Sequence, residues 1–155
     1  MQIFLLRHGQ AEARSHDDST RELTLQGRQD VMAVARQFAQ RNIQPDCCLA
    51  SPYARARQTA ELFVAEAGLI HALELNEILV PSVGAVHVLQ FLGSLQARRV
   101  LLISHNPLLS ELGALLLEGS RQPLQVLRTS ELLAIDCEVP GPGTGTVVFD
   151  LVANA

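Results

Sequence analysis

The first nine residues, MQIFLLRHG, constrain the fold of this chain more than any other stretch. They hold an uninterrupted apolar run, Ile3 to Leu6, that stops at Arg7, His8 and Gly9. A short apolar run that ends in glycine is typical of a strand buried on both faces in the middle of a parallel sheet. Such a strand delivers its last residues to the carboxyl edge of the sheet, where open α/β folds bind ligands. We therefore expect Arg7 and His8 at a binding edge.

Two later stretches repeat this architecture. Val100–Ile103 is a second apolar run, and His105 follows it after one serine. Asp46–Ala50 predicts a further strand, and the helix after it carries Arg55 in its first turn. A cation at a helix N-terminus is unfavourable by about 0.3–1 kcal/mol, so its presence there indicates a functional role. If these strands are parallel, Arg7, His8, Arg55 and His105 converge at one edge of the sheet.

These four side chains have the chemistry of a phosphoryl site. Guanidinium groups bind phosphate oxygens in a fork geometry, and a neutral imidazole can attack phosphorus to form a phosphohistidine intermediate. The arginines and the second histidine then stabilise the equatorial oxygens of the transition state. Arginine supplies the charge that a metal would bring, so we expect no metal and no cofactor. The chain also lacks a P-loop and a GxGxxG motif, so nothing local indicates nucleotide chemistry.

The remaining pattern predicts a three-layer α/β/α fold, with a mainly parallel sheet and a C-terminal antiparallel hairpin. The polar loop Ala11–Glu22 follows the first strand, in a position to cover the site; a metal role for its His16, Asp17 and Asp18 is disfavoured against a solvated loop. The expected helices span about 25–41 with Thr24 as N-cap, 52–67 with Ser51 as N-cap, 85–95, and 108–118 preceded by Asn106 as N-cap and Pro107. The expected hairpin pairs Ser130–Cys137 with Thr146–Val152.

Composition limits the remaining possibilities. The 155 residues are enough for one domain, 1–155, and 48% of them are hydrophobic. The net charge of −4 argues against a nucleic-acid partner, although all 12 basic residues are arginine. No apolar run is long enough to span a bilayer, no signal peptide is recognisable, and the three cysteines suit neither disulfides nor a zinc site. We therefore expect a cytoplasmic protein without a membrane partner, and a monomer.

Four blocks of sequence occur in an order that resembles a known family. They are RHG at 7–9, RELTLQG at 21–27, SPYARARQTAE at 51–61 and ISHNP at 103–107. Together they resemble the histidine phosphatase superfamily in its phosphoglycerate mutase-like branch, and most of all the SixA-type protein phosphohistidine phosphatases. The resemblance implies that His8 is the nucleophile that becomes phosphorylated. It further implies that Arg7, Arg55 and His105 bind the phosphoryl group, with Arg21 as an additional contact at the mouth.

The chain departs from the ester-cleaving members of that branch. Where they carry an asparagine six residues after the nucleophile, this chain has Arg14, and it is too short for the insert that supplies their general acid. Glu77 is the one candidate for that acid, and the loop Val80–Ala85 contains no carboxylate. The absence of a strong acid fits a phosphoramidate substrate, because an imidazole leaving group needs less protonation than an alkoxide.

Three functions follow from these observations. The first is a metal-independent phosphatase acting on phosphohistidine in a signalling or phosphotransfer protein. The second is a small-molecule phosphomonoesterase of the same fold, which would require Glu77 as general acid. The third is a catalytically weak module that binds phosphoproteins. The presence of both histidines and both arginines favours an enzyme over a binding module, because binding alone requires no nucleophile.

Overall fold

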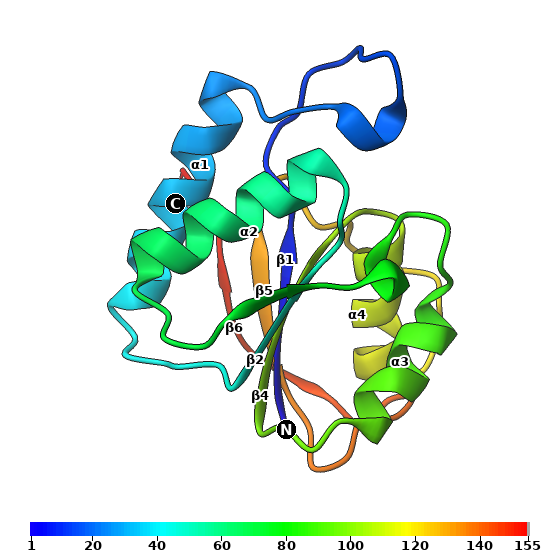
Figure 1. The fold of residues 1–155 in the computed structure, drawn as a ribbon. Coiled ribbons are helices and arrows are strands. Elements are labelled where there is room, and N and C mark those ends of the chain that lie inside the picture. Colours follow the sequence, from blue (N-terminus) through cyan, green and yellow to red (C-terminus); the bar gives the residue numbers. More distant parts are fainter. Residues whose placement is uncertain (155) are drawn as a thin grey trace.

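The computed structural model describes residues 1–154 and is built on a single six-stranded sheet (Figure 1). The strands are β1 (Gln2–Arg7), β2 (Cys47–Ala50), β3 (Leu73–Leu75), β4 (Arg99–Ser104), β5 (Leu132–Asp136) and β6 (Thr146–Leu151). The helices are α1 (Leu25–Ala39), α2 (Ala54–Ala67), α3 (Ala85–Ser94) and α4 (Leu108–Glu118), with short 3-10 helices η1 (Asp18–Thr20) and η2 (Glu77–Leu79). The strand order is β3-β2-β4-β1-β5-β6.

Strand β1 lies inside the sheet, as its apolar run predicts. It pairs in parallel with β4, in the register Gln2↔Arg99, and antiparallel with β5, in the register Gln2↔Asp136. Strands β2 and β3 continue the parallel part, whereas β5 and β6 form the C-terminal antiparallel hairpin. The prediction of a mainly parallel sheet with a C-terminal hairpin is therefore confirmed.

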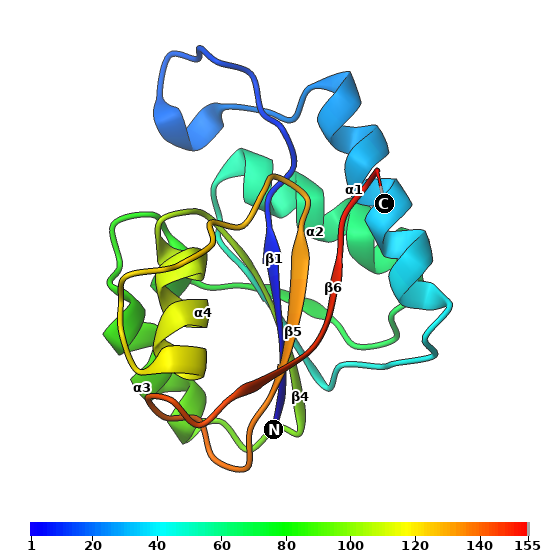
Figure 2. The ribbon, with the colours of Figure 1, turned by 180° about the vertical axis from the view of Figure 1, so that it is seen from behind.

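The side chains of β1 alternate between two hydrophobic cores. Ile3 and Leu5 point into the core that α3 and α4 cover, whereas Phe4 and Leu6 point into the core covered by α1 and α2. Figures 1 and 2 show the two helix pairs on opposite faces of the sheet. Full burial of each such side chain contributes about 1.5–3 kcal/mol, which explains why a continuous apolar run occupies this position.

Two predicted N-caps are wrong. Helix α2 begins at Ala54 with Tyr53 as its N-cap, not at Pro52 after a Ser51 cap, because Tyr53 has an extended backbone with a ψ of 138°. Helix α4 spans Leu108–Glu118 as predicted, but its N-cap is Pro107 and not Asn106. In contrast, Thr24 caps α1 as predicted, since its hydroxyl accepts a hydrogen bond from the Gly27 N–H at 2.9 Å.

The loop Ala11–Glu22 rises above the carboxyl end of β1 and returns through η1 (Figure 2). Its two ends meet in an antiparallel bridge between Ala11 and Leu23. Below the bridge, Gly27 packs directly on the backbone of Gln10: a Cβ atom added to Gly27 would lie 2.1 Å from the Gln10 carbonyl oxygen. The close approach that a glycine at this position suggests is thus present, and it joins the start of α1 to the end of β1.

Among residues 1–154, no helix is long and apolar enough to cross a membrane. Across the same residues, no group of three or more histidine, cysteine, aspartate or glutamate side chains is arranged to hold a metal ion. Cys47, Cys48 and Cys137 are free thiols.

Candidate active site

His8 lies at the carboxyl end of β1, and one of its ring nitrogens is hydrogen-bonded to the backbone. Its Nδ1 lies 2.7 Å from the Gly9 carbonyl oxygen, and because a carbonyl only accepts, Nδ1 carries the proton. In the neutral ring Nε2 then has a free lone pair, which accepts from Arg55 Nε at 3.3 Å. The Gly9 N–H donates to the Thr59 hydroxyl at 3.0 Å and so ties this end of β1 to α2. The geometry leaves Nε2 as the nitrogen of His8 that can act as a nucleophile.

Both site histidines are buried and neutral at physiological pH. Burial lowers the pKa of His8 to about 4; the hydrogen bond to Gly9 opposes this change, while the charges of Arg55, Arg7 and Arg21 add to it. Burial likewise lowers the pKa of His105 to about 3, with further contributions from His8 and Arg55. An unprotonated imidazole is the reactive form in nucleophilic attack, so this environment keeps His8 competent at pH 7.

His105 follows β4 and lies against His8, with ring centroids 5.1 Å apart. Its Nε2 forms a 2.8 Å hydrogen bond with the buried Ser51 hydroxyl, and the Tyr53 ring packs edge-on at a centroid distance of 5.3 Å. Its Nδ1 is buried and has no hydrogen-bond partner within residues 1–154. A buried polar atom of this kind is costly unless a ligand or water satisfies it.

One nitrogen of the Arg7 guanidinium is hydrogen-bonded to the backbone, and another has no partner among the described residues. Its Nη1 donates to the Leu127 carbonyl at 2.8 Å, whereas its buried Nε has no partner among the described residues. Ser130 has a φ of 61°, and its N–H donates to the carbonyl oxygens of Arg7 and His8, which ties the segment before β5 to the end of β1. The guanidinium is thus held beside His8 with an unsatisfied N–H, as suits a site for an anion.

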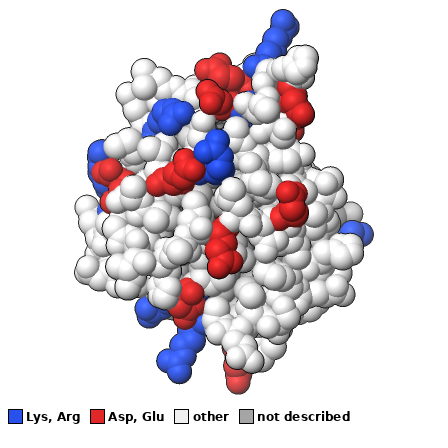
Figure 3. Space-filling view, in the orientation of Figure 1, with Lys and Arg blue, Asp and Glu red and all other residues white. Residues whose placement is uncertain are grey.

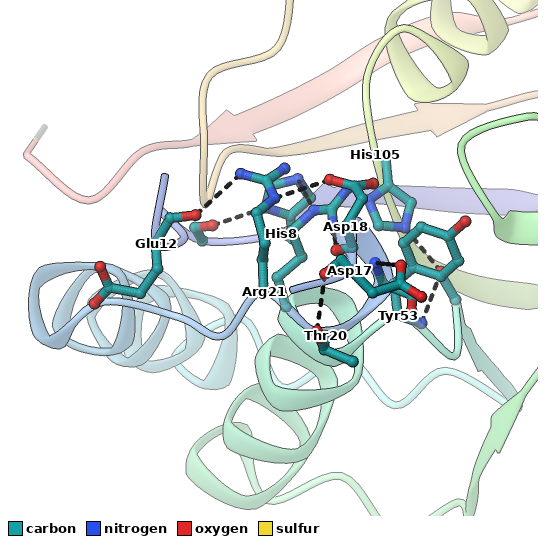
Figure 4. Close-up of polar contacts among 12 residues, drawn as sticks. His8, Glu12, Asp17, Asp18, Thr20, Arg21, Tyr53 and His105 are labelled. Atoms are coloured by element: carbon teal, nitrogen blue, oxygen red, sulfur yellow. Dashed lines mark hydrogen bonds and ion pairs between the residues drawn. The ribbon is translucent and has the colours of Figure 1, made fainter. Parts of the chain in front are cut away.

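Asp18 of the loop Ala11–Glu22 contacts both Arg55 and Arg21; Figure 4 shows Asp18 and Arg21 beside His8. Arg55 Nη1 donates to the Asp18 carbonyl at 2.8 Å, and its Nη2 lies 3.2 Å from Asp18 Oδ2. Arg21 Nε lies 2.9 Å from Asp18 Oδ1, and its Nη1 donates to the Glu12 carbonyl at 3.1 Å. The loop is largely exposed, as expected, and it reaches the site through Asp18, which also contacts both arginines.

The structure brings Arg7, His8, Arg55 and His105 together, as the strand pattern predicts. Arg21 reaches the cluster through Asp18. Glu77 is exposed on η2, where it lines an open groove of about 540 Å³. The other residues that line this groove are Ser19, Thr20, Glu22, Pro52, Tyr53, Ala54 and Arg57.

Sequence reasoning missed three contributors to the site. Ser51 looks like a helix cap, and an acidic loop residue such as Asp18 looks like one of many solvated carboxylates. The Leu127 carbonyl carries no signal in the sequence, because any residue type can supply a backbone oxygen. One signal for Asp18 was available: it stands three residues before Arg21, a spacing at which side chains of a helical turn meet.

Residues 3–81 match the family model described as the histidine phosphatase superfamily, branch 1. The phosphohistidine phosphatase SixA of Escherichia coli (strain K12) is 33% identical to this chain over 147 residues, which cover 93% of this chain and 90% of that protein. The chain belongs to the histidine phosphatase superfamily. A phosphohistidine phosphatase SixA homolog of Haemophilus influenzae is also similar to this histidine phosphatase, with 32% identity over 80% of this chain and 81% of the homolog.

A solved structure extends the similarity to three dimensions. The structure of the protein histidine phosphatase SixA complexed with tungstate superposes on this histidine phosphatase with a TM-score of 0.89 and 29% sequence identity. The match covers 99% of this chain and 97% of that one. The likeness therefore spans the strand ends, the loop Ala11–Glu22 and α2, the elements from which the site is built.

Proposed function

We propose that this protein removes the phosphoryl group from phosphohistidine on a signalling or phosphotransfer protein, through a covalent intermediate on His8. The observation that carries the proposal is the environment of His8 Nε2. A neutral, buried imidazole presents the lone pair of Nε2 to Arg55 Nε, and two nitrogens of the neighbouring site residues, Arg7 Nε and His105 Nδ1, are buried without a partner among residues 1–154. The two SixA relatives named as phosphohistidine phosphatases, and the likeness to the tungstate complex, support the same function.

In the first step, His8 Nε2 attacks the phosphorus atom of the substrate. A bond forms between Nε2 and phosphorus while the bond between phosphorus and the substrate imidazole breaks, and the leaving imidazole takes a proton from water. Arg7, Arg55 and His105 bind the three equatorial oxygens, whose negative charge the guanidinium groups offset beside the buried His8. This role requires an Arg55 donor near Nε2, where Arg55 Nε already lies at 3.3 Å.

In the second step, a water oxygen forms a bond to phosphorus while the bond between Nε2 and phosphorus breaks, and the electron pair of that bond returns to Nε2. One proton of the water stays on the released inorganic phosphate and the other neutralises the hydroxide left in the first step, so His8 returns to its neutral form with the proton on Nδ1. The Gly9 carbonyl fixes that proton throughout, because it accepts from Nδ1 at 2.7 Å. Nothing in either step requires a metal or a cofactor.

The open groove beside Tyr53 suits a substrate that is part of a protein, because a partner must present a histidine at the surface. Its lining from η1, the start of α2 and η2 would contact the backbone that flanks the phosphohistidine. We further propose that residues 1–155 act as a single domain and as a monomer.

One observation favours a second candidate, a phosphomonoesterase for small molecules. Glu77 lines the same groove as Tyr53, whose ring packs against His105. Asp18 is unsuited to that role: partial burial raises its pKa, but Arg21 and Arg55 outweigh burial and hold the pKa below its usual value. A carboxylate that stays ionised cannot donate a proton.

The test compares phosphate release from a phosphohistidine-bearing protein with release from a panel of phosphate esters at equal concentration. We expect rapid turnover of phosphohistidine and slow turnover of every ester, because no strong general acid assists an alkoxide. A marked preference for one ester that is lost in Glu77→Gln would instead establish the second candidate.

His8→Ala provides the control for the covalent mechanism. It should abolish both turnover and the labelling of the protein by phosphohistidine carrying ³²P. Full activity in this variant would rule out His8 as the nucleophile, whatever the substrate.

A further inference from the structure

The contact between Asp18 and Arg55 is unexpected for a site that binds a dianion. A carboxylate beside the arginine weakens the positive potential that attracts phosphate, and a site optimised for charge alone would omit it. The carboxylate is nevertheless part of the site: both of its oxygens and its backbone carbonyl are engaged by arginine donors. Its side chain remains 58% exposed, so burial does not force the contact.

The direction of each hydrogen bond shows what the contact achieves. Asp18 engages the two terminal nitrogens of the Arg55 guanidinium, through its carbonyl at 2.8 Å and its Oδ2 at 3.2 Å. The third nitrogen, Nε, points to His8 Nε2 at 3.3 Å. Because a guanidinium is planar, two contacts at its far end fix the direction of the remaining N–H. The Asp18 contacts therefore aim Arg55 Nε at the nitrogen that attacks.

The same carboxylate joins the loop to Arg21. Asp18 Oδ1 accepts from Arg21 Nε at 2.9 Å, while Arg21 Nη1 binds the Glu12 carbonyl on the opposite arm of the loop. One aspartate thus links both arms of the loop to α2. The position of Arg55 and the position of the loop depend on the same group.

We propose that Asp18 is a positioning residue of this phosphatase, which holds Arg55 with its Nε directed at His8 Nε2 and fastens the loop Ala11–Glu22 over the phosphoryl pocket. The inference rests on the proposed function for the role of His8, but the geometry of Arg55 that it explains concerns any tetrahedral oxyanion bound there. Asp18 acts through Arg55 and takes no part in bond making or breaking.

An electrostatic role and a positioning role of the Asp18 carboxylate predict opposite effects of Asp18→Asn on phosphate binding, which makes the proposal testable. If the carboxylate only weakens the positive potential, its neutralisation must tighten the binding of inorganic phosphate. If it positions Arg55, its neutralisation loosens an ion pair and leaves Arg55 free to turn from His8, so phosphate binds more weakly. Misplacement of a group by about 1 Å costs as much as a hundredfold in rate, so kcat should fall about 10- to 100-fold.

Asp17→Asn is the matched control. Asp17 is adjacent and carries the same charge, but its carboxylate accepts from the Ser19 N–H at 2.9 Å, and asparagine retains such an acceptor. The experiment measures the affinity for inorganic phosphate by calorimetry, kcat and KM, and the thermal midpoint for wild type, Asp17→Asn and Asp18→Asn. We expect Asp17→Asn to match the wild type, and Asp18→Asn to lose phosphate affinity and kcat at an unchanged thermal midpoint.

A double variant separates positioning from a general loss of structure. In an Arg55→Lys background the guanidinium is absent, so Asp18→Asn should have little additional effect on phosphate affinity. Tighter phosphate binding by Asp18→Asn, or effects that add fully in the double variant, would overturn the proposal. The phosphate measurements do not depend on the substrate: failure of the wild type to act on phosphohistidine would contradict the proposed function and leave the role of Asp18 to be decided by binding.

Discussion

At the scale of single residues, a backbone carbonyl determines which nitrogen of His8 is reactive. The Gly9 carbonyl holds the proton on Nδ1, and burial keeps the ring neutral. The strand pattern predicted the position of His8, because four apolar residues followed by a polar one is a local signal. It could not predict the tautomer, because the partner is a carbonyl oxygen that every residue possesses. The same reason hides the Leu127 carbonyl that anchors Arg7.

The neutral histidines link stability to pH. His8 has a pKa of about 4 in the folded chain and an ordinary value of 6.5. Between these values the unfolded chain binds more protons, so the free energy of unfolding decreases as the pH falls from about 6.5 towards 4. His8 alone accounts for a loss of about 2 kcal/mol on going from pH 7 to pH 5.

Urea unfolding at pH 7 and pH 5 measures this loss in the wild type and in His8→Asn, which cannot titrate at this position. The variant should lose less stability between the two pH values than the wild type. An equal loss in both proteins would mean that His8 is protonated to the same extent in the folded and unfolded chains.

At the scale of elements, the contact between α1 and the end of β1 depends on one missing side chain. An alanine Cβ at Gly27 would lie 2.1 Å from the Gln10 carbonyl, so Gly27→Ala must push α1 and the loop Ala11–Glu22 away from the sheet. We expect a loss of at least about 1–3 kcal/mol in the free energy of unfolding, the usual cost of overpacking. Chemical denaturation of the variant provides the measurement.

Gly93 in α3 is the matched control for this substitution. No atom lies within 4 Å of a Cβ added there, so Gly93→Ala should gain up to about 1 kcal/mol from helix propensity alone. If both alanine variants were equally stable, the Gly27 contact would not constrain the fold.

Helix starts show where prediction from sequence fails at this scale. Ser51 and Pro52 have the composition of a helix start, yet the helix begins at Ala54. Besides accepting from the Tyr53 N–H, the Ser51 hydroxyl contacts His105, 54 positions away, and the sequence contains no sign of so distant a partner. Thr24 was predicted correctly because its partner, Gly27, is three residues away and belongs to the same local pattern.

At the scale of the whole molecule, the surface charge shows no large region of one sign on the face in Figure 3. Acidic and basic side chains are interspersed on the face shown in Figure 3, in keeping with a net charge of −4. The arginines of the site are the exception, because the fold gathers them from three separate stretches of sequence. They provide the positive charge that phosphoryl transfer requires.

We therefore expect activity to be independent of added chelator. Assays with and without EDTA, after dialysis against it, should give the same kcat and KM, because arginine supplies the charge that would otherwise come from a metal ion. A large loss that Mg²⁺ or Zn²⁺ restores would show that the transition state depends on a metal.

The position of β1 within the sheet has a consequence for synthesis on the ribosome. The first strand to be made pairs with β4, which begins at Arg99, and with β5, which ends at Asp136. At about 5–20 residues per second, these partners follow β1 by a delay on the order of ten seconds. During that interval the apolar run Ile3–Leu6 has no strand to pair with and is exposed to chaperones. Enzyme activity in a translation reaction is therefore a reporter of completed sheet assembly, and no nascent chain that ends before β5 should display it.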